Sequence, residues 1–467
     1  MSAEPRRART RTPVDLARQV AFDALRRVAD EDAYLNLALA RLRDERGISG
    51  RDAAFATELA AGTARMQGAY DAVLDACVRD GIAALQPEVA VALRMGVHQL
   101  LSMRVPPHAA VGTTVELVRA AVGERPVRLT NAVLRAVGGR SLDEWLDICA
   151  PPRGSDLLGH LAVRFSHPRW VVEEFSRLVG ADTELEALLA ADNDAPAVTL
   201  ALRPGLIDLA ALPADAVSAG RWSPYAAMVS GGDPGAIAAV RDGRAGVQDE
   251  GSQLAALMLA RAGIRGRDTR WLDLCAGPGG KSALLTGIAR QRGATLVAAE
   301  RLEHRARLVR SSLRGFGAAG TVVCVDGTRP AWATAAFDRV LVDAPCSGLG
   351  ALRRRPEARW RRTRADVETL VPLQRSLLGA ALDAVRRGGV VAYVTCSPAV
   401  DETRGVVDAV CEARTDVRRV DARPLLPDVP RLGDGPHVQL WPHVHGTDAM
   451  FVSLLRRVPA LNDPSLR

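Results

Sequence analysis

Lysine is almost absent from this sequence: among 467 residues, 61 are lysine or arginine, and Lys281 is the only lysine. Arginine therefore supplies nearly all of the positive charge. A lysine ammonium is compact and strongly hydrated, so a guanidinium cannot replace it in every role. Lys281 is for this reason a candidate functional residue.

Long apolar runs, paired cysteines and a signal sequence are also missing. No stretch reaches the ~18 apolar residues of a membrane span, and the basic start MSAEPRRARTRT is not followed by the apolar segment of a signal peptide. The seven cysteines include no CxxC pair and no zinc-ligand spacing. We therefore expect a cytoplasmic protein with reduced thiols, no metal and no membrane partner.

The charge balance is basic. The formal net charge is +7 and the isoelectric point is near 9.4, so the surface should attract polyanions. The chain is too long for one ordinary core, and two or three domains are expected.

Changes of pattern divide the chain into five parts. Residues 1–12 form a basic tail, and residues 13–145 show apolar spacings of three and four residues that predict an all-α domain. Residues 151–245 mix a helical piece, the strand-like VTLALRP and several Pro/Gly breaks, which predicts a small connecting α/β subdomain. Residues 246–457 alternate apolar strands with helix-length segments, before a tail at 458–467. The alternation predicts a mostly parallel, Rossmann-like α/β sheet with helices on both faces.

A glycine-rich turn follows the first strand of this sheet, in WLDLCAGPGGKSALL. Glycines let the backbone approach a ligand closely, and the next helix points free N–H groups at that ligand. A Walker loop ending at Lys281 would need glycine at position 275, which is Cys275, so an ATPase loop is excluded. A dinucleotide or S-adenosylmethionine site fits the spacing.

Two acidic residues end the next two predicted strands. In such a site a carboxylate about twenty residues after the turn accepts hydrogen bonds from ribose hydroxyls, and Glu300, closing TLVAAE, has this place. Asp326 follows TVVCV, where a carboxylate would face the adenine. The alternative is that both acids are only strand-end caps.

Two cysteines lie at carboxyl ends of predicted strands, where open α/β sheets place reactive groups. They are Cys346 in VDAPCSG and Cys396 in YVTCSP, and Asp343 precedes Cys346 by three residues. The cysteines inside helical or strand patterns are expected to be structural; these are Cys77, Cys149, Cys324 and Cys411.

These segments resemble the RNA cytosine-5 methyltransferases. DLCAGPGGK, VDAPCSG and TCSP match three motifs of that family in order and spacing, and QDEGSQ, RRRPEARWRR and HGTDAMF match further segments. The helical part resembles the NusB-type RNA-binding fold in VPPHAAVGTTVELV and LTNAVLRAV. The combination is similar to the Sun/Fmu group, which modifies small-subunit ribosomal RNA, and implies a Rossmann-like methyltransferase preceded by an all-α NusB-like domain.

The resemblance also implies roles for particular residues. Cys396 becomes the nucleophile, and Cys346 the cysteine that helps to release the product. The implied cofactor is S-adenosylmethionine. The residues implied to contact the cofactor or the target base are Cys275, Ala276, Gly277, Pro278, Gly279, Gly280, Lys281, Glu300, Asp326 and Asp343. Two departures are Glu300, where many members have Asp, and DAMF in place of DGFF.

The chemistry explains why such a set is needed. Carbon 5 of cytosine is too electron-poor to take a methyl group, so a nucleophile must first add to carbon 6. A free thiol has a pKa of ~8.5, so the site must favour the thiolate, and the sulfonium cofactor and Lys281 are candidates for this. Asp343 is the candidate carboxylate for a ring protonated at nitrogen 3, and Cys346 for assisting elimination.

A run of arginines surrounds Trp360 after the Cys346 turn. In an RNA-binding role, guanidinium groups would pair with phosphates and Trp360 would stack on a base; the alternative is a solvated face. The residues predicted to bind RNA are Arg353, Arg354, Arg355, Arg359, Trp360, Arg361 and Arg362. The expected partner is RNA, with 16S ribosomal RNA implied by the resemblance, and the protein is expected to be a monomer.

Three other functions stay open: cytosine-5 methylation of transfer RNA, the same reaction on DNA, and a non-catalytic NusB-like RNA-binding scaffold. DNA enzymes place the nucleophile in the proline-cysteine turn, which would make Cys346 essential and Cys396 dispensable. The intact Cys346, Cys396 and Lys281 argue against the scaffold.

Overall fold

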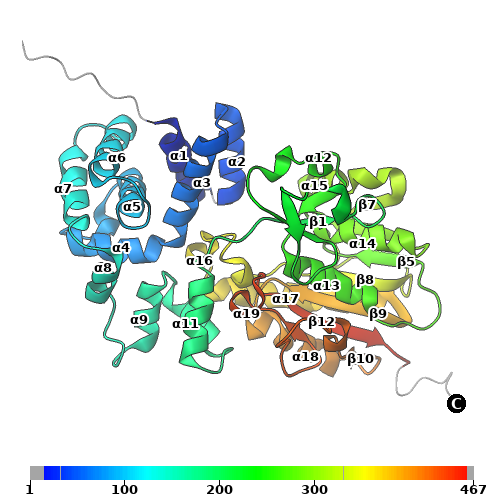
Figure 1. Cartoon of the computed structure of the whole chain (residues 1–467). Coiled ribbons are helices and arrows are strands. Elements are labelled where there is room, and N and C mark those ends of the chain that lie inside the picture. Colours follow the sequence, from blue (N-terminus) through cyan, green and yellow to red (C-terminus); the bar gives the residue numbers. More distant parts are fainter. Residues whose placement is uncertain (1–14, 32, 330, 460–467) are drawn as a thin grey trace, which may run out of the picture. The chain divides into compact units, whose positions relative to one another are not determined.

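The computed structural model describes residues 15–31, 33–329 and 331–459 (Figure 1). The predicted tail at 1–12 lies outside these residues, as does the tail at 458–467 apart from its first two residues. The chain forms two units: a helical unit of residues 1–173 and 355–361, and a sheet unit of residues 174–354 and 362–467. Within the described part of the chain, no helix is long and apolar enough to cross a membrane.

The helical unit confirms the all-α prediction. Its helices are α1 (Leu16–Glu31), α2 (Leu35–Arg46), α3 (Gly50–Arg65), α4 (Gln67–Cys77), α5 (Pro87–Leu101), α6 (Pro107–Ala121), α7 (Val127–Val137), α8 (Leu142–Cys149), α9 (Leu157–Arg164) and, from the second segment, α16 (Ala358–Arg361). Prolines begin α5 and α6, where a missing N–H costs nothing. Ser141 and Glu144 form a capping box at α8.

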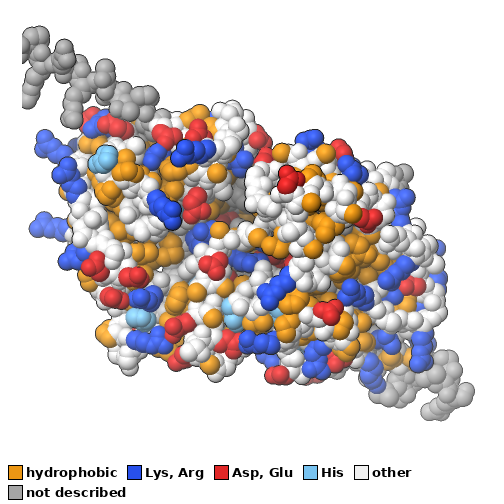
Figure 2. All heavy atoms as spheres, in the orientation of Figure 1, with side chains coloured by type: hydrophobic (Ala, Val, Ile, Leu, Met, Phe, Trp, Pro, Cys, Tyr) orange, Lys and Arg blue, Asp and Glu red, His pale blue; other side chains and the backbone are white. Residues whose placement is uncertain are grey.

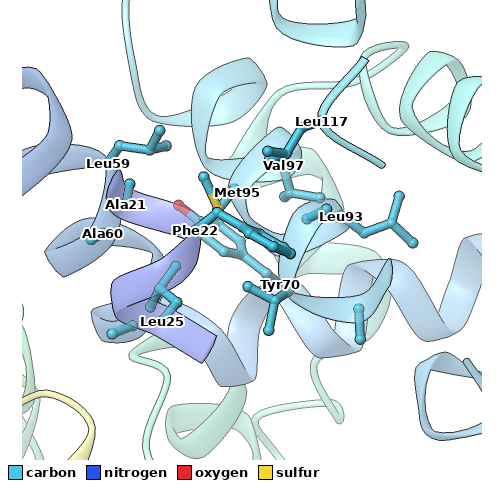
Figure 3. Packing of buried hydrophobic residues seen from close by; sticks show 14 of the residues in the cluster. Ala21, Phe22, Leu25, Leu59, Ala60, Tyr70, Leu93, Met95, Val97 and Leu117 are labelled. Carbon is cyan, nitrogen blue, oxygen red and sulfur yellow. The ribbon is translucent and has the colours of Figure 1, made fainter. Parts of the chain in front are cut away.

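The core of the helical unit is built from the apolar stripes of these helices. Phe22 of α1, Tyr70 of α4 and Leu93 and Met95 of α5 are buried together (Figure 3). This packing follows from the three- and four-residue spacing in the sequence, which places apolar side chains on one face of each helix.

The sheet unit begins with a small antiparallel sheet. Helix α10 (Arg169–Ser176) crosses the boundary between the units and α11 (Asp182–Ala191) follows it. The strands are β1 (Thr199–Leu202), β2 (Val217–Ala219), β3 (Ala226–Val229) and β4 (Ala245–Val247), in the order β2-β3-β1-β4, with α12 (Ala238–Arg241) before β4. The predicted strand VTLALRP is therefore one of four.

The second sheet carries the predicted parallel strands. They are β5 (Arg270–Asp273), β6 (Thr295–Glu300), β7 (Gly320–Cys324), β8 (Phe337–Asp343) and β9 (Val385–Thr395). Their helices are α13 (Glu250–Arg261), α14 (Gly280–Gln291), α15 (Glu303–Leu313), α17 (Arg364–Ala384) and α18 (Arg404–Glu412). The strand order is β10-β12-β9-β8-β5-β6-β7, so the order reverses at β5, where such sheets bind ligands.

The sequence analysis missed the antiparallel end of this sheet. Strand β12 (Phe451–Arg457) runs antiparallel to β9 and to β10 (Val417–Val420). Strand β11 (Val438–Gln439) also pairs with β12, and the short helix α19 (Pro442–His445) lies between these two strands in the chain. β10 has the sequence VRRV, in which only one residue is buried. An edge strand this short and polar has no apolar run to predict it.

Both faces of the second sheet are covered, as predicted. Trp271, Leu341 and Val390 pack in a cluster with α13 and α14. Their neighbours Leu272 and Val391 point the other way and pack with α17 and α18. Successive side chains of a strand face opposite sides, so strands that are apolar throughout become buried on both faces.

Candidate active site

The glycine turn joins β5 to α14, and its geometry requires two of its glycines. Gly279 has a φ of 111°, in the left-handed region, and a Cβ there would lie 2.6 Å from the Cβ of Ser312. A Cβ on Gly277 would lie 2.3 Å from Oε2 of Glu300. Because both distances are too short for a side chain, the turn can pass this close to α15 and to the end of β6 only with glycine.

Glu300 ends β6 and faces the turn. Its Oε2 accepts a hydrogen bond from the Gly277 N–H at 3.1 Å, and its Oε1 accepts one from the Leu302 N–H at 3.0 Å. Arg305 donates to the Gly277 carbonyl oxygen at 2.8 Å. Glu300 is thus fixed against the turn by bonds to both neighbouring loops.

Asp326 follows β7 and makes local bonds. Its Oδ1 accepts from the N–H and the hydroxyl of Thr328 at 2.9 and 2.7 Å, and these bonds hold the pKa of Asp326 below its ordinary value. Such bonds are those of a strand-end cap, yet each carboxylate oxygen has a second lone pair. The cap and the cofactor roles of Glu300 and Asp326 are therefore compatible, and the cofactor contact stays a prediction.

Two further residues of the turn form hydrogen bonds through their backbone groups, and a third, Cys275, has a shifted pKa. The Ala276 N–H donates to the Ala299 carbonyl at 2.9 Å, and the Pro278 carbonyl accepts from the Ser312 hydroxyl at 2.9 Å. Burial raises the pKa of Cys275 well above its ordinary value. Its sulfur is therefore a neutral thiol and not a second nucleophile.

Asp273, the last residue of β5, is a buried acid that the sequence analysis did not single out. Its Oδ2 accepts from the Ser282 hydroxyl at 2.6 Å, whereas its buried Oδ1 has no hydrogen-bond partner among the described residues. Burial raises the pKa of Asp273 to about 7. Its position directly before the glycine turn, in DLCAGPGGK, is the signal that could have identified it.

Lys281, the only lysine, pairs with Asp343 at the end of β8. The Lys281 Nζ lies 2.9 Å from Oδ2 of Asp343, and the two side chains are 10% and 27% exposed. Burial opposes the charge, but the attraction of Asp343 and of Cys396 raises the pKa of Lys281. The lysine therefore stays an ammonium ion beside the reactive turns.

The two predicted reactive cysteines come together. The Sγ atoms of Cys346 and Cys396 are 3.4 Å apart, and both side chains are half-buried. The hydrogen bond to Cys396, together with burial, raises the pKa of Cys346 well above its ordinary value. The Gly350 N–H donates to the Cys396 carbonyl at 2.9 Å, which ties the two turns to each other.

The predicted RNA-binding run does not form one exposed surface. Arg359 is fully buried, and its Nη1 donates to the carbonyl oxygens of Arg65 and Ser166 at 3.2 and 2.9 Å. Arg361 donates to the Ala33 carbonyl at 2.8 Å. These bonds fasten α16 within the helical unit. The prediction that Arg359 contacts phosphates is therefore wrong for this structure, because its guanidinium is buried and donates to backbone carbonyl oxygens.

Trp360 and Arg355 also pack within the helical unit. A Cβ on Gly68 would lie 2.1 Å from the Trp360 ring, and the Arg355 guanidinium lies 4.8 Å from the centre of the Tyr34 ring. Trp360 is thus a packing residue. Arg355 is exposed and Arg362 partly exposed, and RNA contact stays a prediction for them. On the face shown in Figure 2, basic and acidic side chains are interspersed.

Arg353 and Arg354 form a buried ion cluster with two acids. Their Nε atoms donate to Oδ1 of Asp448, both at 3.0 Å, and their Nη2 atoms donate to Oδ2 of Asp249 at 3.0 and 2.7 Å. Burial and the repulsion of Asp249 raise the pKa of Asp448 to about 6. The cluster ties QDEGSQ, RRRPEARWRR and HGTDAMF together, which explains these three segments structurally. It corrects the prediction that Arg353 faces RNA, because that side chain is buried; Arg354 is partly exposed, and RNA contact stays a prediction for it.

Comparison with known proteins gives the family. The sequence model of the family described as 16S rRNA methyltransferase RsmB/F matches residues 264–456, and that of the NusB family matches residues 15–138. A putative methyltransferase of Mycobacterium tuberculosis is 51% identical, over 96% of this chain and 98% of that protein. The ribosomal RNA small subunit methyltransferase B of Vibrio cholerae is 31% identical, over 88% of this chain and 92% of that protein.

A solved structure shares the whole fold. The crystal structure of PH0851 has a TM-score of 0.77 at 18% identity, covering 96% of this chain and 100% of that one. The family matches confirm the resemblance to the small-subunit ribosomal RNA methyltransferases with a NusB-like first part. The chain belongs to the methyltransferase family described as 16S rRNA methyltransferase RsmB/F, with a NusB-family domain in its first part.

Proposed function

We propose that this protein transfers the methyl group of S-adenosylmethionine to carbon 5 of a cytosine in small-subunit ribosomal RNA, with Cys396 as the covalent nucleophile. The observation that carries the proposal is the pair of thiols, whose Sγ atoms lie 3.4 Å apart at the ends of β8 and β9. Methylation at carbon 5 needs one thiol that adds to carbon 6 and later leaves. A second thiol in contact with the first fits assistance to that departure.

The residues around the glycine turn fit S-adenosylmethionine. The turn has no space for side chains at Gly277 and Gly279, Glu300 ends β6 where a ribose acceptor belongs, and Asp273 keeps a buried oxygen without a partner among the described residues. When bound, the cofactor supplies an electrophilic methyl group on a cationic sulfur. The carboxylates of Asp343 and Glu300 favour a cation at this edge of the sheet.

The proposed reaction uses the thiols in sequence. The Cys396 thiolate adds to carbon 6 as nitrogen 3 takes up a proton from solvent, and the Asp343 carboxylate accepts a hydrogen bond from that N–H. The electron pair that moves to carbon 5 then forms the bond to the methyl group, whose bond to the cofactor sulfur breaks and leaves its electron pair on that sulfur. Loss of the carbon 5 proton to water lets the S–C6 pair return to the Cys396 sulfur, and nitrogen 3 gives its proton back to solvent. The S–H of Cys346 stabilises this leaving thiolate.

Charge supports Cys396 as the nucleophile. The ammonium of Lys281 interacts favourably with Cys396, whereas the pKa of Cys346 is raised by its hydrogen bond to Cys396 and by burial. Two thiolates at this distance would repel each other, so one thiol should ionise at the expense of the other. The DNA-type assignment, with Cys346 as nucleophile, is therefore disfavoured.

The choice of RNA rests on different support. The chain carries a net charge of +7, and its relative in Vibrio cholerae is named a ribosomal RNA small subunit methyltransferase. Bisulfite sequencing of total RNA from cells with and without the protein tests this directly. We expect the loss of one cytosine signal in small-subunit ribosomal RNA. Loss confined to transfer RNA would change the substrate, and no loss at all would favour the scaffold.

Variants of the two cysteines test the mechanism. Cys396→Ala should abolish methyl transfer and leave cofactor affinity within a few-fold, because this thiol makes the bond to carbon 6. Cys346→Ala should accumulate a protein–RNA adduct that survives a denaturing gel, because addition proceeds while release stalls. The double variant should form no adduct. Full activity in Cys396→Ala would rule out the mechanism, and loss of adduct in Cys346→Ala alone would reverse the two roles.

A further inference from the structure

Glu402 is a fully buried acid six positions after Cys396, at the end of a short 3-10 turn over Val400–Glu402. Its carboxylate does not bond within its own turn. Oε1 accepts from the Ser347 N–H at 2.7 Å, and Oε2 accepts from the Ser347 hydroxyl at 2.5 Å. Ser347 directly follows Cys346, so both carboxylate oxygens of Glu402 accept hydrogen bonds from the residue beside that thiol.

Gln374, from the middle of α17, holds the other side of Cys346. Its Nε2 donates to the Pro345 carbonyl at 2.8 Å and to Oε1 of Glu402 at 3.1 Å. Gln374 is itself fully buried. The residues before and after Cys346 are therefore both bonded to one buried pair, Glu402 and Gln374.

The same network reaches the turn of Cys396. The Ser347 and Ser397 hydroxyl oxygens are 3.1 Å apart, and Ser397 directly follows Cys396. The Ser347 hydroxyl is the donor to Ser397 as well as to Glu402, so its one proton is shared between the two acceptors. Tyr393 of β9 donates to the Glu402 carbonyl at 2.7 Å. The acid thus connects both cysteine turns through a continuous set of hydrogen bonds.

We infer that Glu402 is a positioning residue that seats the Cys346 turn against Cys396 and keeps Cys346 as the protonated member of the thiol pair. The inference rests on the proposed function of these thiols and deepens it. Glu402 lies on the Cys346 side of the thiol pair, and the Lys281 ammonium, which is paired with Asp343, lies on the Cys396 side. The bond to Cys396, burial and then the charge of Glu402 all raise the pKa of Cys346, whereas Cys396 interacts favourably with Lys281.

This arrangement explains how two thiols in contact take different roles. A proton shared between two sulfurs is placed by the charges around them. Glu402 beside Cys346 disfavours a thiolate there, and the Lys281 ammonium, although paired with Asp343, still attracts Cys396, so the proton stays on Cys346 and the thiolate is Cys396. A Cys346 held at this distance can then donate its S–H to Cys396 as the adduct breaks.

Glu402→Gln is the decisive variant, because it keeps the shape and an acceptor for the Ser347 N–H while removing the charge. Alkylation by iodoacetamide in the absence of RNA, mapped to each cysteine by mass spectrometry, should then show Cys346 reacting about threefold faster at pH 8, the effect of about half a pKa unit. Turnover should fall about tenfold with the KM for RNA unchanged, and the adduct should accumulate. Ser347→Ala, which loses the hydroxyl's bonds to Glu402 and Ser397 but keeps the N–H bond to Glu402, should give a weaker form of the same changes.

Asp338→Asn is the matched control. Asp338 is also a fully buried acid of the sheet unit, but it lies at the start of β8, where it accepts from the Thr269 and Arg270 N–H groups. This variant should lower stability without changing the alkylation profile. The inference is overturned if Glu402→Gln matches the wild type in both readouts, or if Asp338→Asn reproduces its effects. If the wild type methylates no RNA, the proposed function fails, but the alkylation profile still decides the role of Glu402.

Discussion

Asp273→Asn should make the stability of the sheet unit less sensitive to pH. The Asp273 side chain is 1% exposed, and burial raises its pKa from an ordinary 3.8 to about 7. Repulsion from Asp343 adds to this rise, while the Ser282 hydrogen bond and Lys281 oppose it. Asparagine keeps an acceptor for the Ser282 hydroxyl and cannot ionise, so the variant isolates the titration of one carboxyl group.

The sign of the effect follows from linkage. A carboxyl group whose pKa is higher in the folded chain takes up a proton on folding, so its contribution to stability is full at low pH. That contribution is lost as the pH rises from the unfolded pKa of 3.8 through the folded pKa of about 7. At ~1.4 kcal/mol for each pH unit of this window, the wild type should lose about 2–3 kcal/mol from this group between pH 5 and pH 8.

Urea unfolding of both proteins, followed by circular dichroism at several pH values, measures the difference. Other titrating groups are the same in the two chains and cancel in the comparison. We expect the difference in free energy of unfolding, Asp273→Asn minus wild type, to rise by about 2–3 kcal/mol between pH 5 and pH 8. A difference that stays constant within ~0.5 kcal/mol over this range would refute the reasoning, because Asp273 would then not titrate there.

Two further predictions separate functional from structural roles. Glu300→Ala should weaken S-adenosylmethionine binding by roughly 1–3 kcal/mol, measured by calorimetry, if the carboxylate accepts from the ribose; unchanged affinity would leave Glu300 as a strand-end cap of the Gly277 turn. Arg359→Ala should destabilise the helical unit by roughly 2–4 kcal/mol, because two buried carbonyls lose their donor, while the salt dependence of RNA binding should match that of the wild type. A flatter salt dependence in Arg359→Ala would restore the phosphate-contact interpretation.

The fold could be predicted to the extent that burial leaves a pattern. Strands such as β8 and β9 are apolar on both faces, and a run of this kind between helix-length segments indicates a parallel sheet. The edge strand β10 is short and half polar, so its place beside β12 depends on contacts distant in sequence. The assignment of residues 355–361 to the helical unit has the same origin, because no local pattern records which core a short segment joins.

The candidate site was predictable where a rule of position applies. Carboxyl ends of parallel strands meet at one edge of the sheet, so the sequence alone places Cys346 and Cys396 near each other. RNA contact was wrongly predicted for buried members of the arginine run, because the sequence shows the charge of a side chain and not its exposure. Arg359 and Arg353 are buried, one against carbonyl groups and the other against carboxylates. Glu402 was overlooked for the opposite reason, since an acid in a polar loop looks solvated until its partners are known.

The geometry around position 281 explains why this residue is a lysine and not an arginine. The Lys281 Nζ lies 2.9 Å from Oδ2 of Asp343, and the same ammonium also interacts favourably with Cys396. An arginine here would form a planar, two-pronged pair with the carboxylate and spread its charge over a larger group, which would fill space beside the thiols. In the proposed reaction, the smaller ammonium leaves that space for the target ring. The only lysine in a chain that otherwise uses arginine is therefore explained by the size and shape of its cation.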